Sequence, residues 1–151
     1  MEDQLFNQTV NELLALSHSK VQVILEPRFQ DNRLVGGKYH LASHTIFLYK
    51  EEIVRQCCEL FGSHLRLKEY IAVVLAHELG HSEDLELEQL AAALDGPLTG
   101  RQEAEIRLRI EENAWAYAIS LLTEADPYFL HMIMEESLFS YRNQLDRFRI
   151  A

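Results

Sequence analysis

Residues 71–81 read IAVVLAHELGH and are the most informative part of the sequence for the fold. They complete a segment, residues 65–81, whose apolar side chains recur at helical spacing and form one stripe: Leu67, Ile71, Val74, Leu75 and Leu79. The segment therefore predicts a helix that is buried along one side. Glycine costs a helix about 1 kcal/mol relative to alanine, so Gly80 indicates a packing or turning requirement just before His81.

Around this helix the hydrophobic pattern predicts a short sheet and further helices. Before it we expect a helix over residues 3–19, strands over 21–25, 38–41 and 45–49, and a helix over 51–61 that ends at Gly62. After it we expect helices over 85–94 and 99–122, and a last helix that follows Pro127 and runs to about residue 148. The order is typical of an α+β fold in one domain, residues 1–151, with a short, mainly antiparallel sheet packed against several helices.

Composition and charge narrow the classes of function. The chain has 151 residues, of which 48% are apolar and 25% charged, as expected of a globular domain. Its net charge of −10 disfavours direct binding to nucleic acid and is compatible with a basic protein partner. Residues 1–10 lack the apolar core of a signal peptide, and the longest uncharged apolar run, residues 71–76, is too short to cross a bilayer. We therefore expect no membrane association.

The two cysteines, Cys57 and Cys58, are neighbours in the sequence. Adjacent cysteines on a helix cannot form an ordinary disulfide with each other, and they do not have the spacing of a zinc knuckle. We interpret both as reduced, partly buried side chains, which fits a cytoplasmic protein.

The residue types at the end of the quoted stretch suit a metal site. His77 and His81 lie four residues apart, just over one helical turn, so both imidazoles project from one face and can bind one Zn²⁺. Glu78 is rotated about 100° around the helix from His77. Its carboxylate then lies beside the metal, where it can act as a general base. A structural alternative is two half-exposed histidines near a helix C-terminus, where the helix dipole favours cations.

A catalytic zinc needs a third protein ligand. The metzincin motif would place glycine and histidine where this chain has Asp84 and Leu87, so the ligand must come from elsewhere. Glu111 shares a helix side with apolar residues, and a carboxylate there needs a partner. Glu112 is turned a further 100° or so and looks more solvent-facing, but the pattern leaves both glutamates open, and Glu111 could also be an ordinary surface residue.

Together these residues resemble the ImmA/IrrE family of bacterial and phage metallopeptidases, which are small gluzincins. The family's second segment usually reads Glu-x-x-Ala-Asn/Asp-x-Phe-Ala-x-x-Leu-Leu. Here the HELGH motif is followed by Glu111-x-x-Ala114-Trp115-x-Tyr117-Ala118-x-x-Leu121-Leu122. The resemblance covers roughly residues 20–122, judged on motif order and spacing.

The resemblance implies a zincin-like domain with zinc held by His77, His81 and Glu111 and with Glu78 as the general base. It implies a cytoplasmic metallo-endopeptidase that cleaves a specific protein, such as a DNA-binding repressor of a phage or mobile element. In zincins the edge strand before the active-site helix commonly holds the peptide by strand addition. We expect that strand to be residues 45–49.

The chain departs from the family at Trp115, which stands where a polar residue commonly orients a zinc-binding histidine. This departure motivates an alternative function, a zinc-binding anti-repressor or interaction protein with little or no activity. A plain helical domain with an accidental motif is the third possibility. The residue that stabilises the oxyanion is also open, and the chemically suitable candidates are His40, His44, Tyr117, Tyr128 and His131, with His44 preferred for its place in the hairpin.

Overall fold

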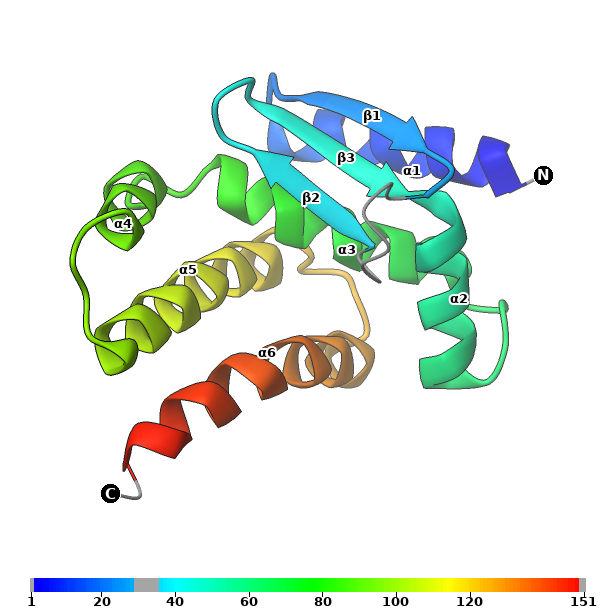
Figure 1. Ribbon diagram of the computed structural model, residues 1–151. Helices are drawn as coiled ribbons and strands as arrows, with labels where there is room; N and C mark the ends of the chain where they lie inside the picture. The colour runs from blue at the N-terminus through cyan, green and yellow to red at the C-terminus, as the bar shows by residue number, and fades with distance from the viewer. Residues whose placement is uncertain (1, 29–35, 150–151) are drawn as a thin grey trace.

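The quoted stretch forms the second half of α3 (Leu67–Ser82), which lies at the centre of the protein (Figure 1). The computed structural model describes residues 2–28 and 36–149. Within them α3 contacts α1, α2, α5 and the strands β2 and β3. It is buried on more sides than a single apolar stripe predicts, because Val73, Ala76 and Gly80 are buried as well.

The other predicted helices are confirmed, with ends that shift by one or two residues. They are α1 (Glu2–Ser17), α2 (Lys50–Phe61), α4 (Leu87–Leu94), α5 (Gly100–Leu121) and α6 (Pro127–Arg149). Gly62 ends α2 in the left-handed conformation, with φ of 75°, and donates its N–H to the Cys58 carbonyl. Thr99 begins α5 through a capping box with Gln102. No helix in the described part of the chain has the length and apolar character needed to cross a membrane.

The sheet contains β1 (Gln22–Glu26), β2 (Gly37–His40) and β3 (Thr45–Tyr49), in the order β1-β3-β2. β3 pairs in parallel with β1 and antiparallel with β2, so the sheet is mixed. The expectation of a mainly antiparallel sheet was therefore wrong. Periodicity shows which residues share a face but does not reveal that β3 inserts between the first two strands.

The core lies where the sheet and α1 meet α3. Phe6 of α1, Ile46 and Leu48 of β3, and Ile71 and Leu75 of α3 are fully buried in one cluster. Burying each such side chain contributes about 1.5–3 kcal/mol. The helices α5 and α6 lie on the opposite side of α3 from the sheet (Figure 1). The helix α3 is therefore enclosed between the sheet on one side and α5 and α6 on the other (Figure 1).

Gly80 lets α3 and α5 approach each other closely. A Cβ atom at Gly80 would lie 2.3 Å from the Ala114 carbonyl oxygen and 2.7 Å from the Ala114 Cα. Only a glycine fits at this crossing without moving the backbone of α5. The packing requirement inferred from the sequence is confirmed.

We predict that Gly80→Ala destabilises the protein. The methyl group must push α5 away from α3, which costs about 1–3 kcal/mol, beyond the ~1 kcal/mol that alanine gains in helix propensity. Gly96→Ala is the matched control, because its Cβ would lie 3.4 Å from the Ala93 carbonyl oxygen, which is an ordinary contact. Urea unfolding should show a loss for Gly80→Ala and a change within about 0.5 kcal/mol for Gly96→Ala. Equal stability of the two variants would contradict this packing.

Candidate metal site

Two histidines and a glutamate meet near the C-terminal end of α3. The side chains of His77, His81 and Glu78 are only 13%, 10% and 7% exposed. The rings of His77 and His81 stand edge to face with centroids 4.7 Å apart. The helical spacing thus brings both imidazoles to one place, as predicted.

The carboxylate of Glu111 reaches both histidines from α5. Its Oε1 lies 3.0 Å from Nε2 of His77, and its Oε2 lies 3.3 Å from Nε2 of His81. Glu112 is exposed and lines a separate hollow with Leu90. Of the two glutamates that the sequence left open, the fold therefore brings Glu111 to the histidines and turns Glu112 away.

Glu78 occupies the other side of the His77 ring. Its Oε2 lies 3.1 Å from Nδ1 of His77, so it does not share the Nε2 side with Glu111. The backbone of β2 passes directly over it, and a Cβ atom at Gly37 would lie 2.9 Å from Cγ of Glu78 and 3.1 Å from its Oε2. Gly37 thereby sets the position of the Glu78 carboxylate.

The charges of this cluster compensate one another. Burial by itself lowers the pKa of His77, but the carboxylates of Glu78 and Glu111 outweigh it and raise that pKa well above the ordinary value. Burial acts to raise the pKa of Glu111, but hydrogen bonds from His77 and His81 lower it overall. The raised pKa of His77 and the lowered pKa of Glu111 both favour an ion pair between these two side chains.

The cluster could hold a metal ion. His77, Glu78 and His81 each offer a ligand atom within 4.8 Å of the other two. The Glu111 contacts to the two Nε2 atoms are shorter, at 3.0 and 3.3 Å. Two ligand atoms on a tetrahedral Zn²⁺ lie about 3.3 Å apart when each is 2.0–2.1 Å from the metal. The 3.0 and 3.3 Å contacts are short enough for Glu111 to supply a ligand atom together with the two histidines.

Trp115 supports His77 in a different way from a polar residue. Its ring stacks on the His77 imidazole with centroids 4.6 Å apart and an angle of 21° between the planes. The indole Nε1 donates a hydrogen bond to Ser137 Oγ at 3.2 Å, which ties Trp115 to α6. The orientation of His77 is therefore fixed by packing and by the Glu78 contact at Nδ1.

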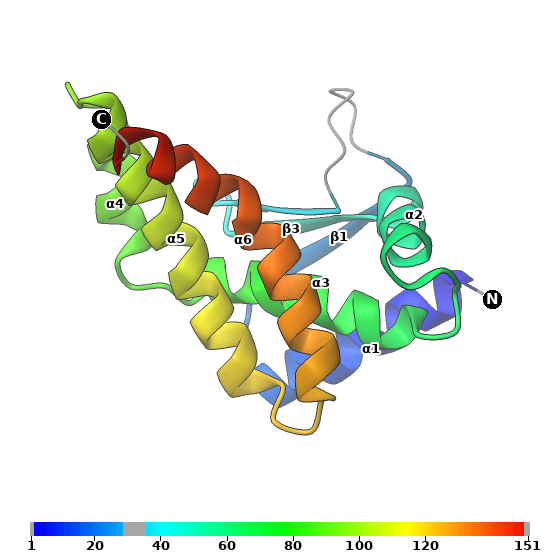
Figure 2. The same ribbon diagram turned by 90° about the horizontal axis from the view of Figure 1, so that it is seen from below.

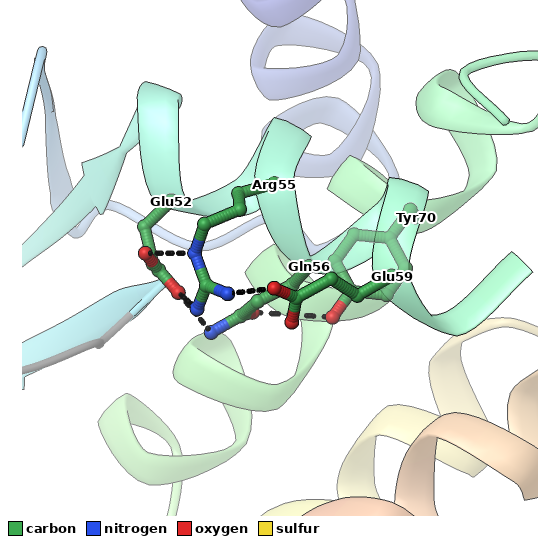
Figure 3. Close-up of polar contacts among 5 residues, drawn as sticks. All are labelled: Glu52, Arg55, Gln56, Glu59 and Tyr70. Carbon is green, nitrogen blue, oxygen red and sulfur yellow. Dashed lines mark hydrogen bonds and ion pairs between the residues drawn. The ribbon is translucent and has the colours of Figure 1, made fainter. Parts of the chain in front are cut away.

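A cavity of about 870 Å³ opens in front of the histidines. Its walls come from β2, α2, α4 and α6 as well as from α3 and α5. On the α2 side, Arg55 pairs with Glu52 and Glu59, and Tyr70 donates its hydroxyl proton to Gln56 Oε1 at 3.1 Å (Figure 3). This volume is in the range of sites that take small ligands or a few residues of a peptide.

None of the five residues proposed for oxyanion stabilisation lines this cavity. The preferred candidate, His44, lies in the turn between β2 and β3 with φ of 49° and contacts the Tyr39 hydroxyl through Nδ1 at 2.8 Å. His44 therefore belongs to the turn and not to the wall of the cavity. The tyrosines that do line the cavity are Tyr39, Tyr70 and Tyr141.

The expectation that residues 45–49 form an edge strand was wrong. β3 lies between β1 and β2 and pairs with both, so it has no free edge. The strand that borders the cavity is β2, which contributes Gly37, Lys38 and Tyr39 to its wall. Within residues 2–28 and 36–149, no further strand pairs with β2.

We predict that the protein binds one Zn²⁺ through this cluster. Zinc should raise the melting temperature of the wild type, because a ligand at 100 times its Kd adds about 2.7 kcal/mol of stability. Glu111→Gln should weaken zinc binding at least ten-fold, because the loss of a partner that only orients a ligand already costs about 10–100-fold. Glu112→Gln is the control, since Glu112 is the next residue in the sequence but is exposed and turned away from the histidines. Equal zinc affinities of the two variants, measured by calorimetry, would exclude Glu111 as a ligand.

Comparison with known proteins identified no relative of this chain. No family model matches the chain, and neither the curated proteins nor the solved structures contain a significant match. The motif resemblance and the geometry of the cluster are therefore the grounds on which a function can be argued.

Proposed function

We propose that the protein is a zinc-dependent metallo-endopeptidase of the gluzincin type. The observation that carries this proposal is the Glu111 carboxylate, which contacts Nε2 of both His77 and His81 while Glu78 stays free of that contact. This is the division of labour that a catalytic zinc site needs, with three ligands on one side and a separate carboxylate beside them.

His77, His81 and Glu111 would hold the zinc. When bound, the zinc supplies Lewis acidity for the hydrolysis of a peptide bond. The low exposure of all three side chains excludes bulk water from the ligands, which strengthens their interactions. The adjoining cavity leaves room for a substrate on the side that the protein does not fill.

Glu78 would move the proton that the reaction requires. In hydrolysis a water oxygen bonds to the peptide carbonyl carbon, and the bond from that carbon to the amide nitrogen breaks. The carboxylate of Glu78 accepts one proton from the water and gives it to the departing nitrogen, so no proton is lost or gained overall. Its place under Gly37, at the wall of the cavity, supports this role.

The substrate would lie along the outer edge of β2. Tyr49 donates its N–H to the Gly36 carbonyl at 2.8 Å, and Lys38 pairs with Phe47 in the same register. Since hydrogen-bonded pairs alternate in an antiparallel ladder, Gly37 and Tyr39 direct their N–H and C=O groups to the free edge. An extended peptide can pair with these groups. From the motif resemblance, we propose a cytoplasmic protein target such as a DNA-binding repressor.

We predict that Glu78→Gln abolishes cleavage while zinc binding and stability persist. A glutamine of nearly the same shape cannot accept the proton, and the loss should reach at least 10²–10³-fold in rate. The zinc-loaded protein is incubated with a proteome-derived peptide library, and new N-termini are read by mass spectrometry. Cleavage by Glu78→Gln at the wild-type rate would contradict the mechanism.

The alternative is a zinc-binding interaction protein with little or no activity. Trp115 favours it, because this residue stands where a polar residue commonly orients a zinc-binding histidine. The same library decides between the two functions. Zinc uptake and capture of a protein partner, without any new N-termini from the wild type, would support the interaction protein. Cleavage that depends on Glu78 supports the peptidase.

Gly37→Ala tests how β2 positions the base. The added methyl group would lie 2.9 Å from Cγ of Glu78 and must displace its carboxylate. We expect a loss of cleavage rate of about ten-fold or more, in line with the sensitivity of catalysis to displacements near 1 Å. Zinc affinity should stay near that of the wild type, because the atoms nearest to the added methyl group belong to Glu78 and Val74 and not to the three ligands. Unchanged cleavage would show that Glu78 does not depend on this contact.

A further inference from the structure

Three tyrosine hydroxyls border the cavity, and two of them are engaged within the protein. The Tyr39 hydroxyl contacts Nδ1 of His44 at 2.8 Å, and the Tyr70 hydroxyl donates to Gln56 Oε1 at 3.1 Å (Figure 3). Tyr141 also lines the cavity, and among the described residues its hydroxyl has no hydrogen-bond partner. Every buried side-chain nitrogen or oxygen atom in the described part of the chain has a hydrogen-bond partner. The Tyr141 hydroxyl, which has none, is therefore accessible to solvent. It is thus available to a ligand.

The register of α6 against α5 brings Tyr141 level with Glu111. The two helices run antiparallel side by side (Figure 2). They are joined by the hydrogen bond from Trp115 Nε1 to Ser137 Oγ. Tyr141 lies four residues after Ser137 on α6, and Glu111 lies four residues before Trp115 on α5. Each is therefore about 6 Å along its helix from the hydrogen-bonded pair. Tyr141 therefore lies on the α6 wall of the cavity that His77, His81 and Glu111 also line.

Burial and the nearby carboxylates keep the phenol of Tyr141 protonated. Burial, and after it the charges of Glu111 and Glu78, raise the pKa of Tyr141 to about 12. The influence of both glutamates agrees with the helix register in placing the phenol near the cluster. At neutral pH the group is a hydrogen-bond donor.

We propose that Tyr141 donates a hydrogen bond to the carbonyl oxygen of the scissile peptide as negative charge develops on that oxygen. This inference rests on the proposed peptidase function and assigns the residue that the sequence left open. Ser137 and Ser140 are the other hydroxyls on this wall. Ser137 is tied to Trp115 and Ser140 is exposed, and a serine is a weaker acid with a shorter reach.

The first test is the rate of cleavage by Tyr141→Phe, with Tyr128→Phe as the control. Tyr128 is on the same helix but is 73% exposed and outside the cavity wall. With a peptide that the wild type cleaves, Tyr141→Phe should lower kcat by 10²–10³-fold and change KM by less than about three-fold. Tyr128→Phe should keep wild-type values. Full zinc uptake by both variants would show that the effect is not one of folding.

The second test measures binding and needs no natural substrate. A short peptide phosphonamidate carries a tetrahedral anionic group that imitates the developing oxyanion. Zinc-loaded Tyr141→Phe should bind it at least ten-fold more weakly than the wild type and Tyr128→Phe do. Equal affinities, or a zinc-loaded wild type that binds no phosphonamidate, would overturn the assignment of Tyr141. If cleavage still required Glu78, the peptidase function would stand without this residue. A wild type that takes up no zinc would overturn both.

Discussion

The close crossing of α3 and α5 at Gly80 and Ala114 is the constraint on which the rest of the site depends. A backbone approach that leaves no room for a Cβ atom brings Glu111, one turn before Ala114, against the histidines of α3. Side chains at the crossing are too short to hold the helices farther apart. The distance from Glu111 to the two Nε2 atoms is thus set by helix packing rather than by a flexible loop. A site built this way is held in shape before any ligand arrives.

Burying the cluster of His77, His81, Glu78 and Glu111 costs free energy. Contacts within the cluster and with its neighbours offset this cost. Two imidazoles and two carboxylates lie in a largely apolar setting, where unpaired polar groups are destabilising. Each has a partner in the cluster, and Trp115 shields His77 by stacking. The hydrogen bond from Trp115 to Ser137 extends this support to α6, which also carries Tyr141. The last helix is therefore part of the site as well as of the core.

Much of the fold could be predicted from the sequence because local signals were strong. Gly62, Thr99 and Pro127 marked helix ends, and the two HELGH histidines required only helical periodicity to meet. The apolar side of α5 favoured Glu111 over Glu112 but left both open, and only the packing of α5 against α3 shows that Glu111 reaches the histidines. Strand order was not predictable, because burial patterns do not distinguish β3 at the centre from β3 at the edge. Tyr141 was missed because its position depends on how α6 packs against α5, and no local pattern records that.

A crystal structure of the zinc-loaded protein, with anomalous diffraction at the zinc edge, would show directly which residues bind the metal. We predict one zinc peak about 2.0–2.2 Å from Nε2 of His77, Nε2 of His81 and a carboxylate oxygen of Glu111. Glu78 should lie beside the metal without binding it. A zinc ion coordinated by Glu78 in place of Glu111, or found away from the two histidines, would contradict this assignment of the ligands.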